Sequence, residues 1–132
     1  DAARESWCGL REDLVRGLMA MNIERPTEIQ QKALPEIMEG NDVVLLSETG
    51  SGKTLTYLLP IIDRIKREEK VDGLVYRPRP KRPRALVIVP TRELGEQVLS
   101  IAKKLTHVAK FGAAGALGGG HVGTRRRRSR RA

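Results

Sequence analysis

Two short apolar runs, each followed by a helical pattern, dominate the distribution of hydrophobic residues along this chain. Val43–Leu46 precedes a loop of small residues and then an amphipathic helix from about Lys53 to Lys66. Ala85–Val89 precedes a helix that Thr91 can cap and that is expected to run to about Ala109. Strand, turn and helix therefore occur twice, and this alternation predicts an α/β fold with a parallel sheet flanked by helices. Ligands of such sheets gather at the carboxyl ends of the strands, where both turns lie.

The residues before the first apolar run predict two further helical segments. Apolar residues recur at helical spacing from Leu10 to Met21, which predicts an amphipathic helix of about three turns. Thr27, with Gln30 three residues later, has the form of a capping box, in which hydroxyl and amide satisfy the exposed backbone donors of a new helix. Trp7, ahead of both segments, is interpreted as a packing residue.

Two prolines are expected to interrupt these helices, because proline lacks a backbone N–H. Pro35 predicts a break and a second short helix up to Glu39, and Pro60 predicts a kink in the helix after the first strand. The helix after the second strand should turn five apolar residues inward: Leu94, Val98, Ile101, Ala102 and Leu105.

The remaining segments set the domain limits. Residues 67–84 are charged and rich in proline, which predicts a long exposed connection. Ala113–Leu117 could form a short third strand. Residues 121–132 are dominated by arginine and lack apolar periodicity, so we expect one domain over residues 1–120 and a disordered basic tail after it.

Composition narrows the class of protein. The chain has 132 residues, which is about one domain, and no apolar run approaches the roughly 20 residues of a membrane span. A single cysteine, Cys8, excludes an internal disulfide and fits a reducing compartment. The six arginines of the tail supply two thirds of the net charge of +9, and a second basic cluster lies at 77–84. Both clusters could bind nucleic-acid backbone non-specifically or be solvated segments.

The loop after the first strand has the composition of a phosphate-binding loop. Small residues allow backbone N–H groups to converge on polyphosphate oxygens, with the positive end of the next helix behind them. Lys53 would reach the β- and γ-phosphates, and the Thr54 hydroxyl would coordinate Mg²⁺. Ser47 stands where the usual pattern has glycine, so an ordinary strand-to-helix turn is the alternative. The expected nucleotide-binding residues of this loop are Ser47, Thr49, Gly50, Ser51, Gly52, Lys53 and Thr54.

Three motifs in order resemble the first RecA-like domain of a DEAD-box RNA helicase, over roughly residues 5–120. They are Pro26–Gln30, Ser47–Thr54 and Pro90–Leu94. The resemblance implies that Gln30, in the segment of Thr27, reads the adenine edge of ATP, a role compatible with capping because different atoms can serve each. Ile23 stands where the family often has an aromatic residue, which implies weaker stacking on the base.

The resemblance also implies an RNA-binding surface. Pro90, Thr91, Arg92 and Glu93 correspond to a family motif that holds RNA backbone phosphates, and a helix start with a hydroxyl and an arginine suits that role. Gly118 and Gly119 fall where the family has a glycine pair against the RNA backbone. The lead helix with Trp7 and residues 22–26 is most similar to plant or algal organellar members, which implies a plastid or mitochondrion.

Several parts of such a helicase are absent from the sequence. It contains no Asp-Glu-Ala-Asp, no Ser-Ala-Thr and no second RecA-like domain with its arginine fingers, so we expect an intracellular fragment that binds ATP and RNA without hydrolysing ATP alone. The alternative is a non-catalytic basic RNA-binding fragment with a vestigial phosphate loop. A small phosphotransferase would need an acceptor pocket and lid arginines that the sequence does not show.

Overall fold

The computed structural model describes residues 2–50, 52–71, 74–75 and 79–118. Ser51, Gly119 and the arginine-rich tail expected at 121–132 lie outside the described residues. Nothing in the described part of the chain has the length and apolar character that a helix needs to cross a bilayer. The described elements are α1 (Ala2–Ser6), α2 (Glu12–Ala20), α3 (Glu28–Met38), α4 (Lys53–Glu68), β1 (Lys70–Val71), β2 (Leu74–Val75) and α5 (Arg92–Ala109).

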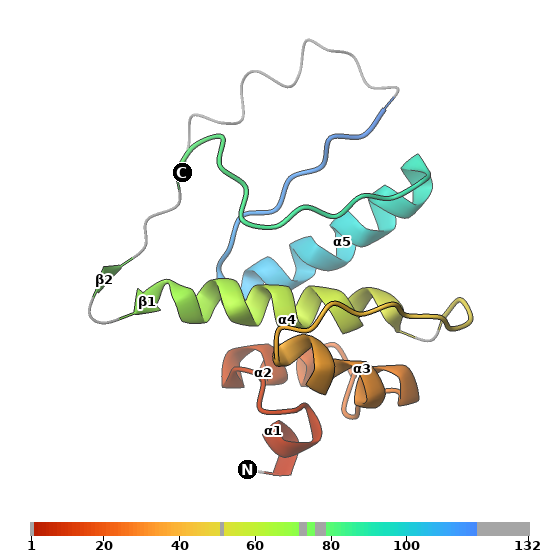
Figure 1. Ribbon diagram of the computed structural model, residues 1–132, viewed down its shortest axis with the longest axis vertical. Coiled ribbons are helices and arrows are strands. Elements are labelled where there is room, and N and C mark those ends of the chain that lie inside the picture. Colours follow the sequence, from red (N-terminus) through yellow and green to blue (C-terminus); the bar gives the residue numbers. More distant parts are fainter. Residues whose placement is uncertain (1, 51, 72–73, 76–78, 119–132) are drawn as a thin grey trace.

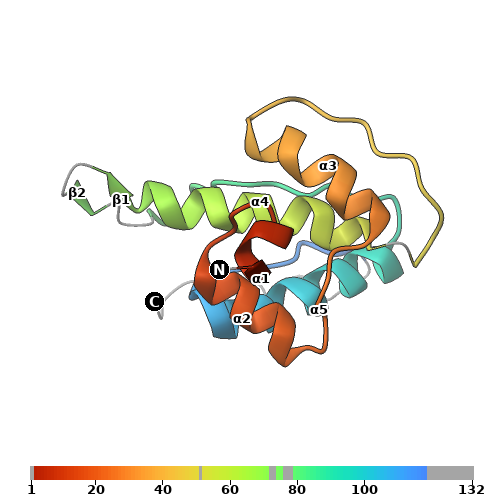
Figure 2. The ribbon, with the colours of Figure 1, turned by 90° about the horizontal axis from the view of Figure 1, so that it is seen from below.

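Helix α4 lies at the centre of the molecule, with α3 packed on one side and α5 on the other (Figures 1 and 2). Helix α2 packs against α5, and α1 packs against α2. The expected helix over Leu10–Met21 is therefore confirmed in its central part. Trp7 is fully buried in the core, as the interpretation of it as a packing residue requires, although its indole N–H has no hydrogen-bond partner among the described residues.

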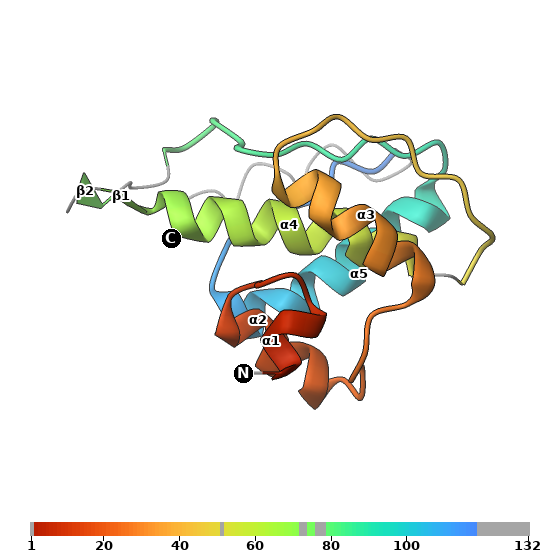
Figure 3. The same ribbon diagram turned by 60° about the horizontal axis from the view of Figure 1, so that its bottom comes forward.

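Three extended segments lie along one side of the helices. Residues 41–50, 84–91 and 111–118 run above α4 and α5 in Figure 3. Helix α5 approaches two of them closely: a Cβ atom on Gly95 would lie 2.6 Å from Leu117 Cδ2 and 3.2 Å from Val89 Cγ2. Gly95 thus allows the helix to approach this layer.

The expected parallel sheet is not formed by the described residues. Val43–Leu46, Ala85–Val89 and Ala113–Leu117 are extended without strand assignment, and the only described sheet is the antiparallel pair of β1 and β2. A strand requires a neighbour in hydrogen-bond register, and neither of the first two segments has a backbone hydrogen bond to another described residue. Their exposure alternates nonetheless: Val44 and Leu46 are each 88% exposed, while Leu45 is partly buried.

Two local expectations are wrong. Helix α3 continues through Pro35 to Met38 rather than breaking there. Helix α4 includes Pro60, and the kink expected at this residue stays a prediction. Proline has a helical φ and removes one donor; α3 and α4 pack against each other, and the packing offsets that loss. Leu94, expected to face inward, is 37% exposed because it lies in the first turn of α5, whereas Val98, Ala102 and Leu105 are buried.

A buried carboxylate joins the start of α2 to α4. Asp63 on α4 is only 2% exposed. The backbone N–H of Arg11 donates to its Oδ1 atom at 2.8 Å, and Arg67 Nε donates to its Oδ2 atom at 2.7 Å. Arg67 Nη2 also donates to the carbonyl oxygen of Gly9 at 2.8 Å. Asp63 therefore satisfies a backbone donor at the start of a helix that has no side-chain cap of its own.

Arg11 forms a second, local interaction at the same place. Its Nη2 atom lies 2.9 Å from Asp13 Oδ2, and its Nε atom donates to Asp13 Oδ1 at 3.1 Å. The hydrogen bond from Arg11 lowers the pKa of Asp13 below its ordinary value of 3.8, against the opposing effect of partial burial. The carboxylate form of Asp13 is therefore favoured in the folded chain.

Candidate functional site

The loop of small residues ends in a backbone conformation that favours glycine. Gly52, the N-cap residue of α4, has φ +88°, and Gly50 has φ +80°. A Cβ atom on Gly52 would lie 2.5 Å from Gln30 Nε2, closer than real side chains approach. Both the left-handed conformation and the proximity of Gln30 therefore require glycine at the position where α4 begins.

The carbonyl oxygen of Gly52 accepts hydrogen bonds from three donors. Thr56 donates from its backbone N–H at 3.2 Å and from its Oγ1 hydroxyl at 2.9 Å, and Gln30 donates from Nε2 at 3.1 Å. Thr56 is fully buried. The sequence reading missed Thr56, although a threonine four residues after the N-cap can bond back to that carbonyl and gives a usable signal.

Gln30 has the capping role predicted for it. The Thr27 side chain accepts from the Gln30 backbone N–H at 3.4 Å, and Gln30 Oε1 accepts from the Thr27 backbone N–H at 2.8 Å. Both halves of the capping box at the start of α3 are present. Gln30 is 1% exposed, which is rare for a glutamine and requires the hydrogen bonds that it makes.

The Gln30 amide therefore joins two parts of the chain that are 22 residues apart. Its oxygen holds the start of α3, and its nitrogen holds the carbonyl that begins α4. An amide nitrogen has two protons. The second proton makes no hydrogen bond to a described residue.

Two side chains in the first turn of α4 have the chemistry of a polyphosphate and magnesium site. Lys53 Nζ donates to the backbone oxygen of Ser47, which holds the ammonium group over the loop. The Thr54 hydroxyl is partly buried and makes no hydrogen bond to a described residue. Together with the left-handed glycines and the helix start, these groups fit a triphosphate with its metal ion.

The other predicted nucleotide residues are placed less distinctively. Thr49 and Thr27 are exposed, and Ile23 is partly buried against the hydrophobic core. Ser51 lies outside the described residues. In the part of the chain that the structure describes, no three His, Cys, Asp or Glu residues gather as a metal site.

The start of α5 forms a second group of polar side chains. Thr91 is its N-cap, as predicted, and its hydroxyl accepts from the backbone N–H of Leu94 at 3.2 Å. Arg92 is exposed, and its Nε atom lies 3.1 Å from Glu96 Oε1. Pro90 and Glu93 are exposed beside them.

The starts of α4 and α5 lie toward the same end of the molecule in all three ribbon views (Figures 1 to 3). The loop before α4 and the Thr91 region thus lie at the ends of the extended segments that lead into the two helices. Gly118 is exposed with open space around its Cα atom, and Gly119 lies outside the described residues.

Comparison with known proteins gives matches over most of the chain. Residues 27–131 match the family model described as DEAD/DEAH box helicase. The chain is 46% identical over 114 residues to DEAD-box ATP-dependent RNA helicase 39 of Arabidopsis thaliana, covering 86% of this chain and 18% of that protein. It is 41% identical over 110 residues to ATP-dependent RNA helicase glh-4 of Caenorhabditis elegans, covering 83% and 9%.

A solved structure agrees with these relatives. The crystal structure of the RNA-helicase Prp28 from Chaetomium thermophilum bound to ADP superposes with a TM-score of 0.71 at 31% identity, over 87% of this chain and 26% of that one. The chain spans less than a fifth of the length of the two curated relatives.

Proposed function

Because the chain belongs to the DEAD/DEAH box helicase family, we propose that it forms the ATP- and RNA-binding part of the first RecA-like domain of an ATP-dependent RNA helicase. The observation that carries the proposal is the hydrogen bond from Gln30 Nε2 to the Gly52 carbonyl, at 3.1 Å. It joins the residue proposed to read adenine to the loop proposed to hold the phosphates. The relatives named as ATP-dependent RNA helicases support this assignment.

The nucleotide would lie at the start of α4. Backbone N–H groups from Ser47 to Gly52 would face the phosphates, Lys53 would exchange its bond to the Ser47 carbonyl for the β- and γ-phosphates, and Thr54 would take one position on Mg²⁺. Bound Mg²⁺ neutralises phosphate charge during phosphoryl transfer. Gln30 would recognise the adenine edge with its remaining amide proton, flanked by Thr27 and Ile23.

The start of α5 would hold the RNA backbone. Thr91 and Arg92 present a hydroxyl and a guanidinium at a helix start, a combination that binds phosphate without reading sequence. Pro90 and Glu93 would shape this contact, and Gly118 with Gly119 would allow the backbone to approach. RNA is therefore the proposed partner of this surface.

We extend the proposal to the sheet expected from the sequence, over a domain of residues 1–120. The alternating exposure of Val44, Leu45 and Leu46 is the pattern of a strand with one face on helices. The absent Asp-Glu-Ala-Asp sequence and second domain support the further proposal that this chain alone does not hydrolyse ATP. A plastid or mitochondrial location stays a prediction from the sequence, which fractionation of cells expressing the parent protein would test.

Binding of a fluorescent ATP analogue to the 132-residue chain tests the central proposal. We expect weak binding that requires Mg²⁺ and is lost in Lys53→Ala. Lys32→Ala is the matched control, because Lys32 is an exposed lysine on α3 that pairs with Glu28 at 2.8 Å. RNA binding without any ATP binding would instead support a basic RNA-binding fragment with a vestigial phosphate loop.

A further inference from the structure

Nearly every cation on the described helices has an assigned partner. Arg16, Lys32, Arg64, Lys66, Arg67 and Arg92 all form ion pairs with acidic residues three or four positions away. Arg4 donates to the Leu10 carbonyl oxygen, and Lys53 donates to the Ser47 carbonyl oxygen. Such pairing is the ordinary arrangement for cations on a helix surface.

Lys103 and Lys104 on α5 are the exceptions. Neither side chain makes an ion pair or hydrogen bond to a described residue, and both residues are exposed. No aspartate or glutamate occurs anywhere in the sequence after Glu96. The carboxyl-terminal half of α5 therefore carries adjacent positive charges with no local acid to neutralise them.

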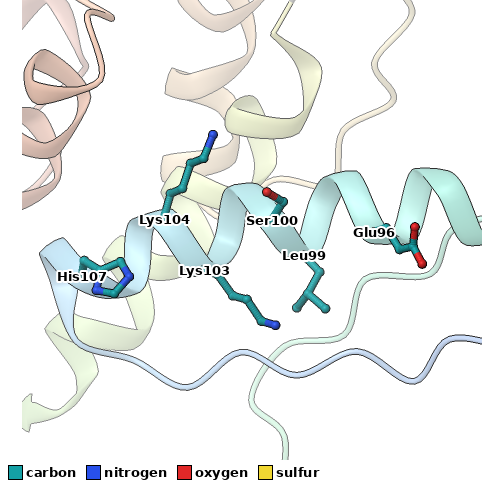
Figure 4. Close-up of a pocket in the computed structure, with 6 residues that line it drawn as sticks. All are labelled: Glu96, Leu99, Ser100, Lys103, Lys104 and His107. Atoms are coloured by element: carbon teal, nitrogen blue, oxygen red, sulfur yellow. The ribbon is translucent and has the colours of Figure 1, made fainter.

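These lysines belong to one exposed face of α5, which we call the lysine face. It is an open depression lined by Glu96, Leu99, Ser100, Lys103, Lys104 and His107 (Figure 4). At about 100° per residue, these positions span an arc of roughly 140°. The buried residues Val98, Ala102 and Leu105 lie on the opposite side of the helix. In Figure 4 the two lysines project to opposite sides of the face, with Ser100 and His107 beside them.

The helix dipole does not account for the two lysines. Cations stabilise a helix when they lie in its last turn, and the effect falls off beyond it. In α5 the last turn contains only His107 as a basic residue, because the helix ends at Ala109. Lys103 and Lys104 lie more than a turn from that end, so they gain little from the helix dipole.

We propose that the lysine face binds phosphates of the RNA backbone, as a second contact along α5 beyond the one at its start. The inference rests on the proposed RNA-binding function of Thr91 and Arg92. Lys103 follows Thr91 by twelve positions, or about 18 Å along the helix axis. At the 3.4 Å per nucleotide of one strand of B-form DNA, this distance corresponds to about five nucleotides. One RNA can therefore reach both contacts, and the Ser100 hydroxyl supplies a further donor.

Salt dependence of RNA affinity tests the proposal. Lys103→Gln together with Lys104→Gln is compared with Lys32→Gln together with Arg64→Gln, which removes two exposed, acid-paired charges from α3 and α4. Binding of a labelled single-stranded RNA to the 132-residue chain is measured between about 50 and 200 mM salt. We expect the slope of log affinity against log salt to fall in magnitude by about 1.4 in the first pair, or about 0.7 for each lost phosphate contact.

The corresponding loss of affinity is at most about 25-fold at 0.1 M salt. Lys103→Arg with Lys104→Arg should keep both slope and affinity, which separates loss of charge from loss of folding. The proposal would be overturned if the Lys103 and Lys104 pair lost no more RNA affinity than the Lys32 and Arg64 pair. An unchanged salt slope in the Lys103 and Lys104 pair would also overturn it. Polyglutamate binding that depends on these lysines while RNA affinity does not would also overturn it, in favour of an acidic protein partner.

Arg92→Gln separates this inference from the proposed function. Loss of RNA affinity in Arg92→Gln with no change in the Lys103 and Lys104 pair leaves the contact at the start of α5 standing and overturns the second contact. The reverse result supports the lysine face and overturns the contact at Arg92.

Discussion

Replacing Gln30 by alanine should lower the free energy of unfolding by about 2–3 kcal/mol. The loss combines about 1 kcal/mol for the helix cap at Thr27, about 1 kcal/mol for the net hydrogen bond to Gly52, and about 0.8 kcal/mol for a buried methylene. Regained side-chain freedom offsets part of the sum. The Gly52 carbonyl keeps both bonds from Thr56, so the Thr27 N–H is the group left without its partner.

Gln30→Glu separates the two functions of the amide. The introduced carboxylate still accepts from Thr27, but an oxygen now faces the Gly52 carbonyl in place of the Nε2 donor. We expect a loss of about 1–3 kcal/mol at neutral pH. Burial raises the pKa of the introduced carboxyl group in the folded chain, and its protonated form can donate to Gly52. The loss of unfolding free energy relative to the parent chain should therefore be smallest below about pH 4, the pKa of the group in the unfolded chain. It should grow as pH rises through the pKa of the group in the folded chain.

Urea unfolding followed by circular dichroism measures both variants. Gln31→Ala is the control, because Gln31 is the exposed neighbour on the same helix and its amide makes only a 3.4 Å contact with the Pro26 carbonyl oxygen. We expect that control to stay within about 0.5 kcal/mol of the parent chain. If Gln30→Ala costs no more than Gln31→Ala, the structural role assigned to the buried amide is wrong.

Three further changes test other parts of the structure. Gly52→Ala should destabilise the chain more than Gly40→Ala in urea titrations, because both glycines have positive φ but only Gly52 would bring a Cβ atom within 2.5 Å of another residue; equal losses would contradict this. Asp63→Asn should cost about 1–3 kcal/mol by the same measurement, since one of its two charge-assisted bonds is lost, and a neutral result would contradict the bridge between α2 and α4. Because the folded pKa of Asp13 is lowered, its contribution to the free energy of unfolding is present above pH 3.8 and is lost as pH falls through the folded pKa. Arg11→Gln should flatten this acid dependence of stability, and an unchanged dependence of stability on pH would refute the role of Arg11 in lowering the pKa of Asp13.

Local features of the fold could be predicted from the sequence. The caps at Thr27 and Thr91 are confirmed because the donors and acceptors lie within three residues of each other. The end of α5 at Ala109 also agrees with the apolar periodicity. The break expected at Pro35 is wrong because packing of α3 on α4, a tertiary contact, offsets the lost hydrogen bond.

Contacts between distant residues could not be predicted. The bond from Gln30 to Gly52 spans 22 residues, and the bond from Arg11 to Asp63 spans 52. Neither has a sequence pattern, because side-chain partners at such separations are decided by how the helices pack. A weak signal exists for Asp63, which is an acidic residue next to Ile62 on the apolar face of α4 with Arg67 one turn later.

The candidate site also has parts that the sequence predicts and parts that it does not. The loop, Lys53 and Thr54 can be proposed as a nucleotide site from residue types and their order, and the alternation of apolar runs and helices predicts that the loop and the start of α5 lie at the same end. Thr56 and the sharing of the Gly52 carbonyl required the structure, since they depend on how α3 lies beside the first turn of α4.

The alternating exposure along the extended segments affects how this chain must be studied. Leu86 is 77% exposed and Ile88 is 85% exposed. Val44 and Leu46, in the segment 43–46, are each 88% exposed. On heating, such apolar segments in extended conformation can pair between molecules, so aggregation would compete with refolding. Melting temperatures of the chain should then vary with scan rate and protein concentration. Reversible urea titration of dilute samples is consequently the suitable way to compare its variants.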